Sequence, residues 1–587
     1  MENKNSNNNL KELSSRKNFK ILFCNVPIRE KPSTFPPVAS TTLCNILIKA
    51  GYYVYFYDID ARRPTLSEIA QFIESERFDV IAISAVVSTS YKYVKELTDI
   101  IKSVSPEVKI ILGGNLAASY EIMLRKCKVD ICAIGEGDKS ILNIINCLNE
   151  NKNFINYDQL SKIKGIAFLD SDGNCIFTEY EELIESDQIQ QPDYEFLEKY
   201  SNINQYILDP MSRYDFAYDD RSYEKKRKNK KMATVFASRG CVNRCTFCHR
   251  WVPKYRIISA RKVIDYMKYL INRYNVGFFC LADESFGESR SWLNEFIDLV
   301  KPLDILFQID GARVSIIKRD PYILKRLKEI GLTAIYFGME SGSDKILNIM
   351  EKNVKSEDNL LAAKICIEAG IYTIIQLIIG MPGENDKTID QTLDFLKKVA
   401  EMSPYIPETS INYLQTLPGS PCYKYLCQQG LLGNGIDGEE KYLLKVSDVN
   451  ASDFSQYVNV SETCLEKVKV WNAKINIIPK IYWLKIHKWN IKSNLIYKSM
   501  LYGEKKKSYS IVSRLKKVLK NQIVVYRFID LMGSFFWKVL LLKYCLSIYG
   551  FKKTILGKFI VEKDSRTKFI ISGSGKSLRK IIDIWIV

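Results

Sequence analysis

Apolar and amphipathic segments alternate regularly along the first quarter of the chain. Strand-like runs rich in Val, Ile, Phe and Tyr cover residues 19–26, 53–59, 79–85, 108–112 and 129–134. Between them lie stretches with the spacing of amphipathic helices, such as 66–76 and 91–104. This alternation predicts an α/β fold over residues 19–150, with a doubly wound, Rossmann-like parallel sheet. Such sheets bind ligands at the carboxyl ends of their strands.

A second series of strand-like runs begins near Met232 and continues to about residue 430. Its six members cover 233–238, 277–282, 305–310, 334–339, 372–379 and 410–415. Helix-like stretches separate them, so we expect a second α/β unit over residues 232–430. Its chemistry is also expected at the carboxyl ends of the strands.

Three segments fall outside these two units. Residues 1–18 are polar and are expected to be disordered. Residues 151–231 are interpreted as a connector with a β-hairpin over 163–178, turned at Asp172-Gly173. The basic run 225–231 within it reads as a solvated linker. Residues 440–587 are expected to form a separate, mainly helical module that contacts the substrate or a partner.

Charge distinguishes this last module from the rest of the chain. From Lys441 onward there are 29 Lys and Arg against 9 Asp and Glu, whereas the preceding residues have 56 and 58. Aromatic residues interleave with these cations, and the apolar stretch 524–551 predicts either a core helix or a helix lying on a membrane surface. Basic charge with aromatics also suits RNA, but no recognisable RNA-binding motif accompanies it, so nucleic acid is not the expected partner.

No signal peptide and no uncharged apolar run of membrane-spanning length occurs, so we expect a cytoplasmic protein.

The most specific chemical feature is the run Cys241-Val-Asn-Arg-Cys245-Thr-Phe-Cys248. This C-x3-C-x2-C spacing presents three thiolates from one loop, and thiolates are the ligands of iron–sulfur clusters. Three ligands for a four-iron cube leave one iron open to a small molecule. A zinc site completed by His249 and a set of unliganded thiols are the alternatives. The other twelve cysteines are scattered singly and read as small buried hydrophobes in a reducing compartment.

This cysteine run, with Phe247 before its third cysteine, resembles the signature of radical S-adenosylmethionine (radical-SAM) enzymes. In that family the open iron of a [4Fe-4S] cluster chelates SAM, and one electron cleaves the sulfonium to an adenosyl radical. The resemblance implies that Cys241, Cys245 and Cys248 hold the cluster and that residues 232–430 form a partial (β/α)6 barrel.

The resemblance also implies a SAM site at the ends of the barrel strands. Carboxylates after the second strand would accept hydrogen bonds from the ammonium of SAM, and an arginine after the third suits its carboxylate. The turns after the fourth and fifth strands resemble those that contact ribose, methionine and adenine. The residues assigned in this way are Phe247, Asp283, Glu284, Arg313, Glu340, Ser341, Gly380 and Gly383. Helix N-termini and ordinary turns are the alternative interpretations of these features.

Placed before a radical-SAM loop, the first domain resembles the cobalamin-binding domain of cobalamin-dependent radical-SAM enzymes. The segments ILGGN and DICAIGEGD resemble its turns. Strand-end residues assigned to cobalamin are Asn25, Asp58, Ser84, Thr89, Gly113, Gly114, Gly135, Glu136 and Gly137. No histidine precedes His249, so no histidine of this domain can ligate cobalt. A docking domain that lost its cofactor and a methylthiotransferase, which needs three further cluster cysteines, are the alternatives.

The family's chemistry implies methyl transfer from methylcobalamin to an unactivated carbon as the leading hypothesis. Ring closure or rearrangement, RNA-base modification and a non-catalytic cobalamin or redox sensor are the other hypotheses. The implied partners are a hydrophobic or anionic small-molecule substrate and a flavodoxin- or ferredoxin-type electron donor. No catalytic acid or base is identified from the sequence.

Overall fold

A computed structural model describes residues 16–151, 155–249, 254–404 and 406–487, all within one compact unit of the chain. Residues 16–18 are helical, so the predicted disordered N-terminus does not extend to residue 18. The stretch 524–551 and the last hundred residues lie outside the described part. Among the described residues, no helix is both long enough and apolar enough to cross a membrane.

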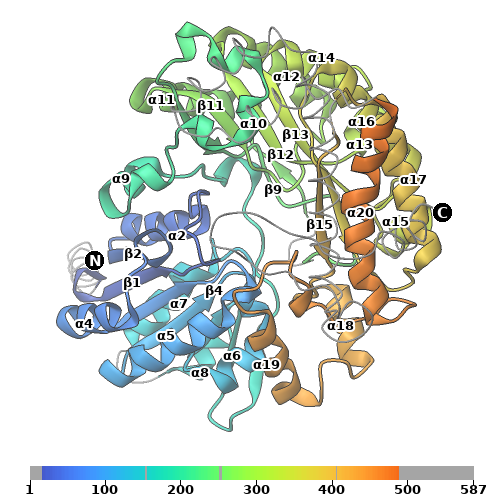
Figure 1. The fold of residues 1–587 in the computed structure, drawn as a ribbon. Coiled ribbons are helices and arrows are strands. Elements are labelled where there is room, and N and C mark those ends of the chain that lie inside the picture. Colours follow the sequence, from blue (N-terminus) through green and yellow to red (C-terminus); the bar gives the residue numbers. More distant parts are fainter. Residues whose placement is uncertain (1–15, 152–154, 250–253, 405, 488–587) are drawn as a thin grey trace, which may run out of the picture. The chain divides into compact units, whose positions relative to one another are not determined.

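The first domain is built on a seven-stranded sheet in the order β2-β1-β3-β4-β5-β6-β7 (Figure 1). Its strands are β1 (Lys20–Asn25), β2 (Tyr53–Asp58), β3 (Val80–Ser84), β4 (Lys109–Gly113), β5 (Ile131–Ala133), β6 (Ile166–Leu169) and β7 (Cys175–Phe177). The first five are parallel, which confirms the predicted doubly wound sheet.

Alternate residues of β1 enter different cores on the two faces of this sheet. Ile21 and Phe23 pack in one core, and Leu22 and Cys24 in the other, as the two-residue period of a strand requires. Helices cover both faces: α2 (Val38–Lys49), α4 (Leu66–Glu76), α5 (Tyr91–Val104), α6 (Tyr120–Lys126) and α7 (Ser140–Glu150).

The connector is more structured than the sequence suggests. Its hairpin, β6 and β7, pairs antiparallel with β5 and therefore extends the first sheet. The basic run 225–231 is not simply solvated, because Arg227 is buried and donates hydrogen bonds to the carbonyl and carboxylate of Asp304. Buried guanidinium groups need such paired acceptors, and a sequence pattern cannot show them.

The second sheet has six parallel strands in the order β15-β14-β13-β12-β11-β8. They are β8 (Lys231–Val235), β11 (Val276–Leu281), β12 (Leu306–Ala312), β13 (Leu332–Glu340), β14 (Ile375–Ile379) and β15 (Thr409–Tyr413). Neighbours in the sheet are consecutive along the chain, and β8 and β15 do not pair, so the barrel is partial, as expected. Figure 1 shows helices along the outer side of this sheet. They include α11 (Ala260–Tyr274), α12 (Arg290–Val300), α16 (Ser356–Ala369) and α17 (Asp386–Met402).

Shorter elements connect these units. They are α3 (Ile59–Arg62), α8 (Tyr157–Leu160), α9 (Tyr194–Tyr200), α10 (Tyr214–Ala217), β9 (Ser238–Arg239), β10 (Arg256–Ile257), α13 (Ser315–Arg319), α14 (Ile323–Glu329) and α15 (Asp344–Ile349). Nine 3-10 turns are also described: η1 (Ser88–Ser90), η2 (Asn115–Ser119), η3 (Ser186–Gln188), η4 (Ile203–Gln205), η5 (Pro210–Ser212), η6 (Asp220–Tyr223), η7 (Lys225–Arg227), η8 (Lys301–Leu303) and η9 (Phe454–Gln456).

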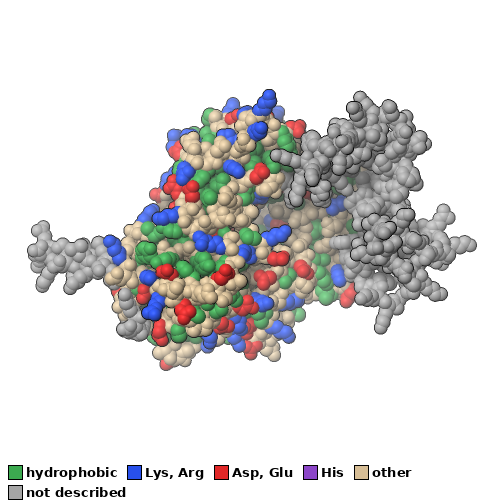
Figure 2. Space-filling view, turned by 60° about the vertical axis from the view of Figure 1, so that its left-hand side comes forward, with side chains coloured by type: hydrophobic (Ala, Val, Ile, Leu, Met, Phe, Trp, Pro, Cys, Tyr) green, Lys and Arg blue, Asp and Glu red, His purple; other side chains and the backbone are tan. Residues whose placement is uncertain are grey.

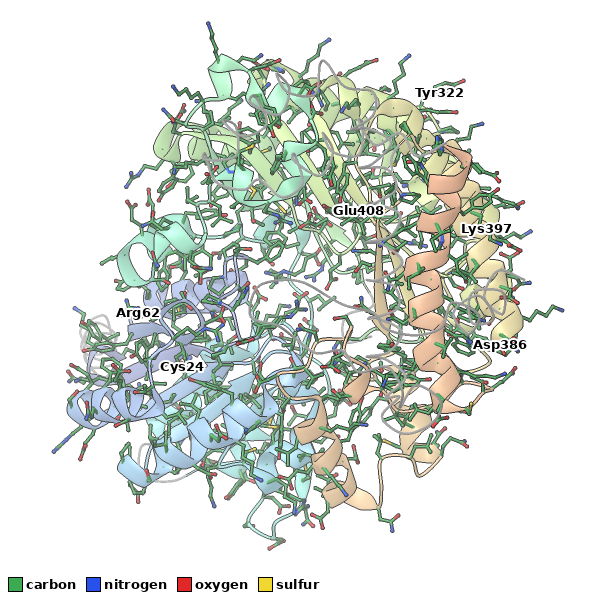
Figure 3. The ribbon with its side chains drawn as sticks, viewed as in Figure 1. Cys24, Arg62, Tyr322, Asp386, Lys397 and Glu408 are labelled. Carbon is green, nitrogen blue, oxygen red and sulfur yellow. The ribbon has the colours of Figure 1, made fainter. Side chains whose placement is uncertain are left out.

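The chain beyond the barrel returns to both earlier domains, through α18 (Pro421–Gln428), α19 (Gly435–Val446) and α20 (Leu465–Ile486). In α19, Leu443 belongs to the core of the first domain, and Glu440 accepts hydrogen bonds from Lys95 and Tyr91. In α20, Trp471 donates to Asp386 at the start of α17, which Figure 3 labels. The residues from 440 to 487 are therefore part of the folded unit rather than a separate module. The change in charge marks a change in composition, not a boundary in packing.

We expect the Leu443 contact to stabilise the whole unit. Leu443→Ala removes a fully buried side chain and should lower the free energy of unfolding by about 2–5 kcal/mol. The neighbouring Leu444 is 42% exposed, so Leu444→Ala should change stability by no more than about 0.5 kcal/mol. Thermal unfolding of the full chain compares the two variants. Equal melting temperatures would contradict docking of α19 on the first domain.

Candidate functional site

The cysteine loop follows β9 at the carboxyl end of β8 and is held by backbone hydrogen bonds. The Thr246 N–H donates to the Met350 carbonyl at 3.1 Å, and the Thr246 carbonyl accepts from the Cys422 N–H at 2.9 Å. Cys245 is buried, whereas Cys248 is exposed. Cys241, Cys245 and Cys248 therefore lie on one anchored loop.

The surroundings of this loop suit negative thiolate ligands. Asn243 donates its N–H to Cys241 Sγ and its amide Nδ2 to Cys245 Sγ, each at 3.5 Å. Burial raises the pKa of the Cys245 thiol, and the nearby Lys352 ammonium opposes this. Among the described residues, no three Cys, His, Asp or Glu side chains converge as ligands of a single metal ion do. An iron–sulfur cube takes one thiolate at each of several corners, so this donor set fits a cluster without such convergence.

Asp283 and Glu284 lie after β11, at the mouth of the barrel. Asp283 is buried, and its Oδ1 accepts hydrogen bonds from the Ala237 N–H at 2.9 Å and the Ser238 hydroxyl at 2.6 Å. Its second oxygen, Oδ2, is buried without a hydrogen-bond partner. Burial raises the pKa of Asp283 to about 7. One oxygen thus orients the strand that precedes the cysteine loop, and the other is available to a donor. Glu284 is exposed.

Glu340 and Lys352 form a buried ion pair beside the cysteine loop, with Lys352 Nζ 3.2 Å from Glu340 Oε1. Glu340 has a φ of +59°, a left-handed conformation that costs a non-glycine residue energy. A Cβ on Gly338 would lie 2.4 Å from Glu340 Oε1, so a larger residue there would displace this carboxylate. Lys352 also lies over the ring of Phe247, 5.9 Å from its centroid. The Lys352 ammonium therefore contacts two of the residues predicted to bind SAM, the carboxylate of Glu340 and the ring of Phe247.

The other predicted SAM residues occupy separate strand ends. Arg313 follows β12 and lies 3.7 Å from Glu288. Ser341 is buried, and its hydroxyl lies 3.3 Å from that of Thr392 on α17. Each of these side chains lies where the sequence places it, at the carboxyl end of its strand.

The turn after β14 is built around a buried carboxylate. Gly380 and Gly383 both have positive φ, +87° and +79°. Glu384 Oε2 accepts from the N–H of Gly380 at 2.5 Å and from that of Met381 at 3.2 Å. Tyr457, from the C-terminal segment, donates its hydroxyl to the Gly380 carbonyl at 2.8 Å. The sequence marked the glycines but not Glu384 or Tyr457, which hold them in place.

Asn25 and Asp58, predicted to meet cobalamin, are engaged in a buried network within the protein. Asn25 Nδ2 donates to Asp58 Oδ1 at 3.0 Å, and the hydroxyl of Tyr206, from the connector, donates to Asp58 Oδ2 at 2.6 Å. Asp58 also accepts from the Ala61 N–H and so caps α3. The acceptor capacity of Asp58 is satisfied by the protein, which the sequence could not show because Tyr206 is remote.

The ends of β3 and β4 come closest to a ligand cradle. Gly114 has a φ of +85°, and a Cβ there would lie 2.3 Å from the Ala85 carbonyl oxygen, so the two loops touch through backbone. Gly113 lies beside it, and Ser84 ends the neighbouring strand. Two hydroxyls in the following turns, Ser88 Oγ and Ser119 Oγ, are buried without hydrogen-bond partners. Thr89 is also buried, and its carbonyl accepts from the Asp448 N–H. Close-packed backbone and unpaired buried hydroxyls suit a large polar ligand.

The turn after β5 pairs with the residues that frame the cysteine loop. Glu136 accepts hydrogen bonds from Arg239 at 3.1 Å and from Arg256, and Asp138 accepts from Arg239 at 2.8 Å. Arg239 lies two residues before Cys241. The N–H of Gly137 is itself taken by the Glu181 carboxylate. Gly135 has a φ of +115°, so this turn keeps its predicted glycine conformation while its polar groups serve the protein.

A second polar cluster, on the inner face of the barrel, was not predicted. Asp310 accepts from the Cys280 thiol at 3.1 Å, from Gln308 Nε2 at 2.6 Å and from Arg213 at 3.4 Å. Burial raises the pKa of Cys280 well above its ordinary value, so this thiol stays protonated. Arg213 comes from the connector, which carried no sequence signal for a site.

Two family models match the chain. Residues 26–145 match the B12 binding domain, and residues 235–396 match the radical SAM superfamily. These ranges contain the strand-end loops of the first domain and the cysteine loop with the first five strand ends of the barrel.

Curated relatives cover both domains. The chain is 28% identical over 390 residues to an anaerobic magnesium-protoporphyrin IX monomethyl ester cyclase of Rubrivivax gelatinosus, which is 64% of this chain and 65% of that protein. It is 23% identical over 380 residues to cytidylyl-2-hydroxyethylphosphonate methyltransferase of Streptomyces wedmorensis, 62% of this chain and 68% of that protein. The chain thus spans less than two thirds of the cyclase.

Solved structures share the fold. OxsB, a cobalamin-dependent SAM radical enzyme with aqua-cobalamin and SAM bound, superposes with a TM-score of 0.57 at 17% identity, covering 85% of this chain and 75% of that one. TsrM of Kitasatospora setae, a radical SAM methyltransferase with cobalamin and a [4Fe-4S] cluster bound, gives 0.53 at 16% identity, covering 70% and 75%.

The buried Glu384 carboxylate in the turn after β14 should make the stability of the protein depend on pH. Burial raises the pKa of Glu384 to about 7, whereas an unfolded Glu titrates near about 4.3. The folded state therefore holds this proton more tightly, and the free energy of unfolding falls as pH rises through this interval. Glu384→Gln keeps a hydrogen-bond acceptor but cannot titrate. Between low and high pH, the free energy of unfolding of this variant should therefore fall less than that of the wild type, with a difference of up to about 3 kcal/mol.

Urea unfolding at about pH 5 and about pH 7.5 measures this difference. Glu462→Gln is the control, because Glu462 is exposed and pairs with Lys345 at the surface. Identical pH slopes for the wild type and Glu384→Gln would contradict the assignment.

Proposed function

This chain belongs to the cobalamin-dependent radical SAM family, and from that premise we propose that it cleaves SAM reductively and transfers a methyl group to an unactivated carbon of a small molecule. The observation that carries the proposal is the pairing of Glu136 with Arg239. It joins a turn assigned to cobalamin to the strand that leads into the cysteine loop. Methyl transfer between two cofactors requires their sites to lie close together.

The residues proposed to hold the cofactors are those assigned from the sequence, with two additions, but without Asn25, Asp58 and Glu136, whose polar groups pair within the protein. Cys241, Cys245 and Cys248 would hold the [4Fe-4S] cluster, and the barrel ends would hold SAM. Ser88 and Ser119, whose buried hydroxyls lack partners, are added to the loops after β3 and β4 as contacts of cobalamin. When bound, these groups supply a reactive radical and a transferable methyl group.

The protein's own residues bind and orient. The free Oδ2 of Asp283 accepts a hydrogen bond from a bound ammonium, and its other oxygen keeps Ser238 in place. Lys352 neutralises Glu340 and stabilises the nearby thiolates. Arg313 provides a planar donor for a carboxylate. Tyr457 covers the turn after β14 and so limits the access of water.

Ring closure is the second candidate, because the cyclase is 28% identical to this chain, compared with 23% for the phosphonate methyltransferase. An external one-electron donor of the flavodoxin or ferredoxin type is required in either case. A cluster held by thiolates needs a reducing compartment, so we propose a cytoplasmic location. On the face shown in Figure 2, basic and acidic side chains are interspersed, which favours a small-molecule substrate over nucleic acid.

Loss of a cluster ligand should abolish SAM cleavage. In anaerobically purified protein, Cys245→Ala should reduce iron content and lower deoxyadenosine formation by at least about a thousandfold, because the thiolate ligand is removed. Cys464→Ala, at an exposed cysteine, is the matched control and should retain both. Equal iron content in the two variants would contradict the assignment of Cys245 as a cluster ligand.

A Cβ at the proposed cobalamin cradle should expel the cofactor. Gly114→Ala places a methyl group against the Ala85 carbonyl, whereas Gly173→Ala meets nothing within 4 Å. Both glycines have positive φ, +85° and +79°, so both variants share the backbone strain of about 1 kcal/mol. Cobalt content after reconstitution with hydroxocobalamin should fall severalfold only in Gly114→Ala. Equal cobalt in both variants would mean that these loops do not hold cobalamin.

A further inference from the structure

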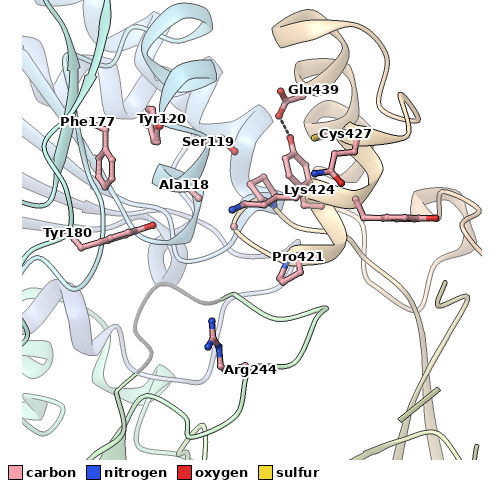
Figure 4. Close-up of a pocket in the computed structure, with 15 residues that line it drawn as sticks. Ala118, Ser119, Tyr120, Phe177, Tyr180, Arg244, Pro421, Lys424, Cys427 and Glu439 are labelled. Carbon is pink, nitrogen blue, oxygen red and sulfur yellow. Dashed lines mark hydrogen bonds between the residues drawn. The ribbon is translucent and has the colours of Figure 1, made fainter. Parts of the chain in front are cut away.

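A cavity of about 930 Å³ lies beside the cysteine loop (Figure 4). Its walls come from three parts of the chain. The first domain contributes the start of α6 and the end of β7, the cysteine loop contributes Arg244, and α18 contributes Pro421 and Lys424. Arg244 lies between the first two cluster cysteines, so the cavity borders the proposed site of chemistry. Its volume is within the range of small-molecule sites.

One wall of the cavity is aromatic. The rings of Tyr120 and Phe177 stack at 5.6 Å with an angle of 16°, and Tyr180 meets Phe177 edge-on at 5.2 Å. Tyr180 is 50% exposed, so an aromatic face is available to a ligand. Flat π-systems pack well on such walls.

The polar groups of the cavity favour an anion. Arg244 and Lys424 both line it, and Figure 4 labels them on two different walls. The carboxylate of Glu439 also lines the cavity and accepts a hydrogen bond from the Tyr423 hydroxyl at 2.5 Å, but the two cations outnumber it.

We propose that this cavity binds the substrate, and that the substrate is a planar, ring-containing molecule with at least one carboxylate. The ring system lies against the aromatic wall formed by Tyr120, Phe177 and Tyr180. The carboxylate lies between Arg244 and Lys424. This assignment of a substrate class depends on the proposed function, whereas the binding properties of the cavity do not.

Fluorescence anisotropy of two pyrene probes on the full-length holoprotein tests the proposal. We expect 1-pyrenebutyrate to bind about tenfold more tightly than neutral 1-pyrenebutanol, because only the former carries a carboxylate. Lys424→Met should weaken the butyrate about fivefold and leave the butanol unchanged. Lys397→Met, on α17 and outside the cavity, is the matched control and should change neither (Figure 3).

Phe177→Leu should weaken both probes, because it removes the stacked ring while retaining apolar volume. Thermal unfolding of each variant confirms that it is folded. Equal affinities for the two probes, or equal losses in Lys424→Met and Lys397→Met, would overturn the proposal. The titration needs neither reductant nor turnover. Probe binding as expected together with no deoxyadenosine formation would therefore retain the cavity and reject the proposed function.

Discussion

The buried ion pairs of Glu136 with Arg239 and Arg256 are the interaction on which the site depends. The side chain of Arg256 is 2% exposed and that of Glu136 is 10% exposed. Removing one partner of such a pair leaves an uncompensated charge and typically costs about 3–5 kcal/mol. The pairs fix the turn after β5 against β9 and β10, the two short strands on either side of the cysteine loop. The Glu136 carboxylate thus positions the turn after β5 in the first domain relative to the cysteine loop of the barrel.

Local sequence signals were sufficient for the strands and for the cysteine loop. The apolar run of β1 and the C-x3-C-x2-C spacing are properties of neighbouring residues, so no tertiary contact was needed to predict them. In contrast, the residues assigned to cobalamin have hydrogen-bond partners that lie far away along the chain. Tyr206 reaches Asp58 across 148 residues, and Arg256 reaches Glu136 across 120. A single sequence carries no record of such pairings, so residues that hold the fold together were assigned to a ligand.

The inner face of the barrel is layered in a way that suits the proposed radical chemistry. Phe278 packs with Phe216, Met232 and Leu306 in an apolar cluster. Asp310, Gln308, Cys280 and Arg213 form a polar layer next to it, and the strand ends carry the residues assigned to SAM. An apolar floor below a hydrogen-bonded polar layer disfavours water in the lumen, and reactive intermediates survive longer in a dry site.

The insertion of Leu443 into the first domain has a consequence for biosynthesis. The first sheet is complete in sequence at Phe177, but its last core side chain follows 266 residues later, at Leu443. At a ribosomal rate of about 5–20 residues per second, this delay lasts roughly 13–53 s. During that time the nascent first domain leaves an apolar patch uncovered. The domain that is made first therefore completes its core after the barrel has left the ribosome, and the cell's chaperones have an interval in which to act on it.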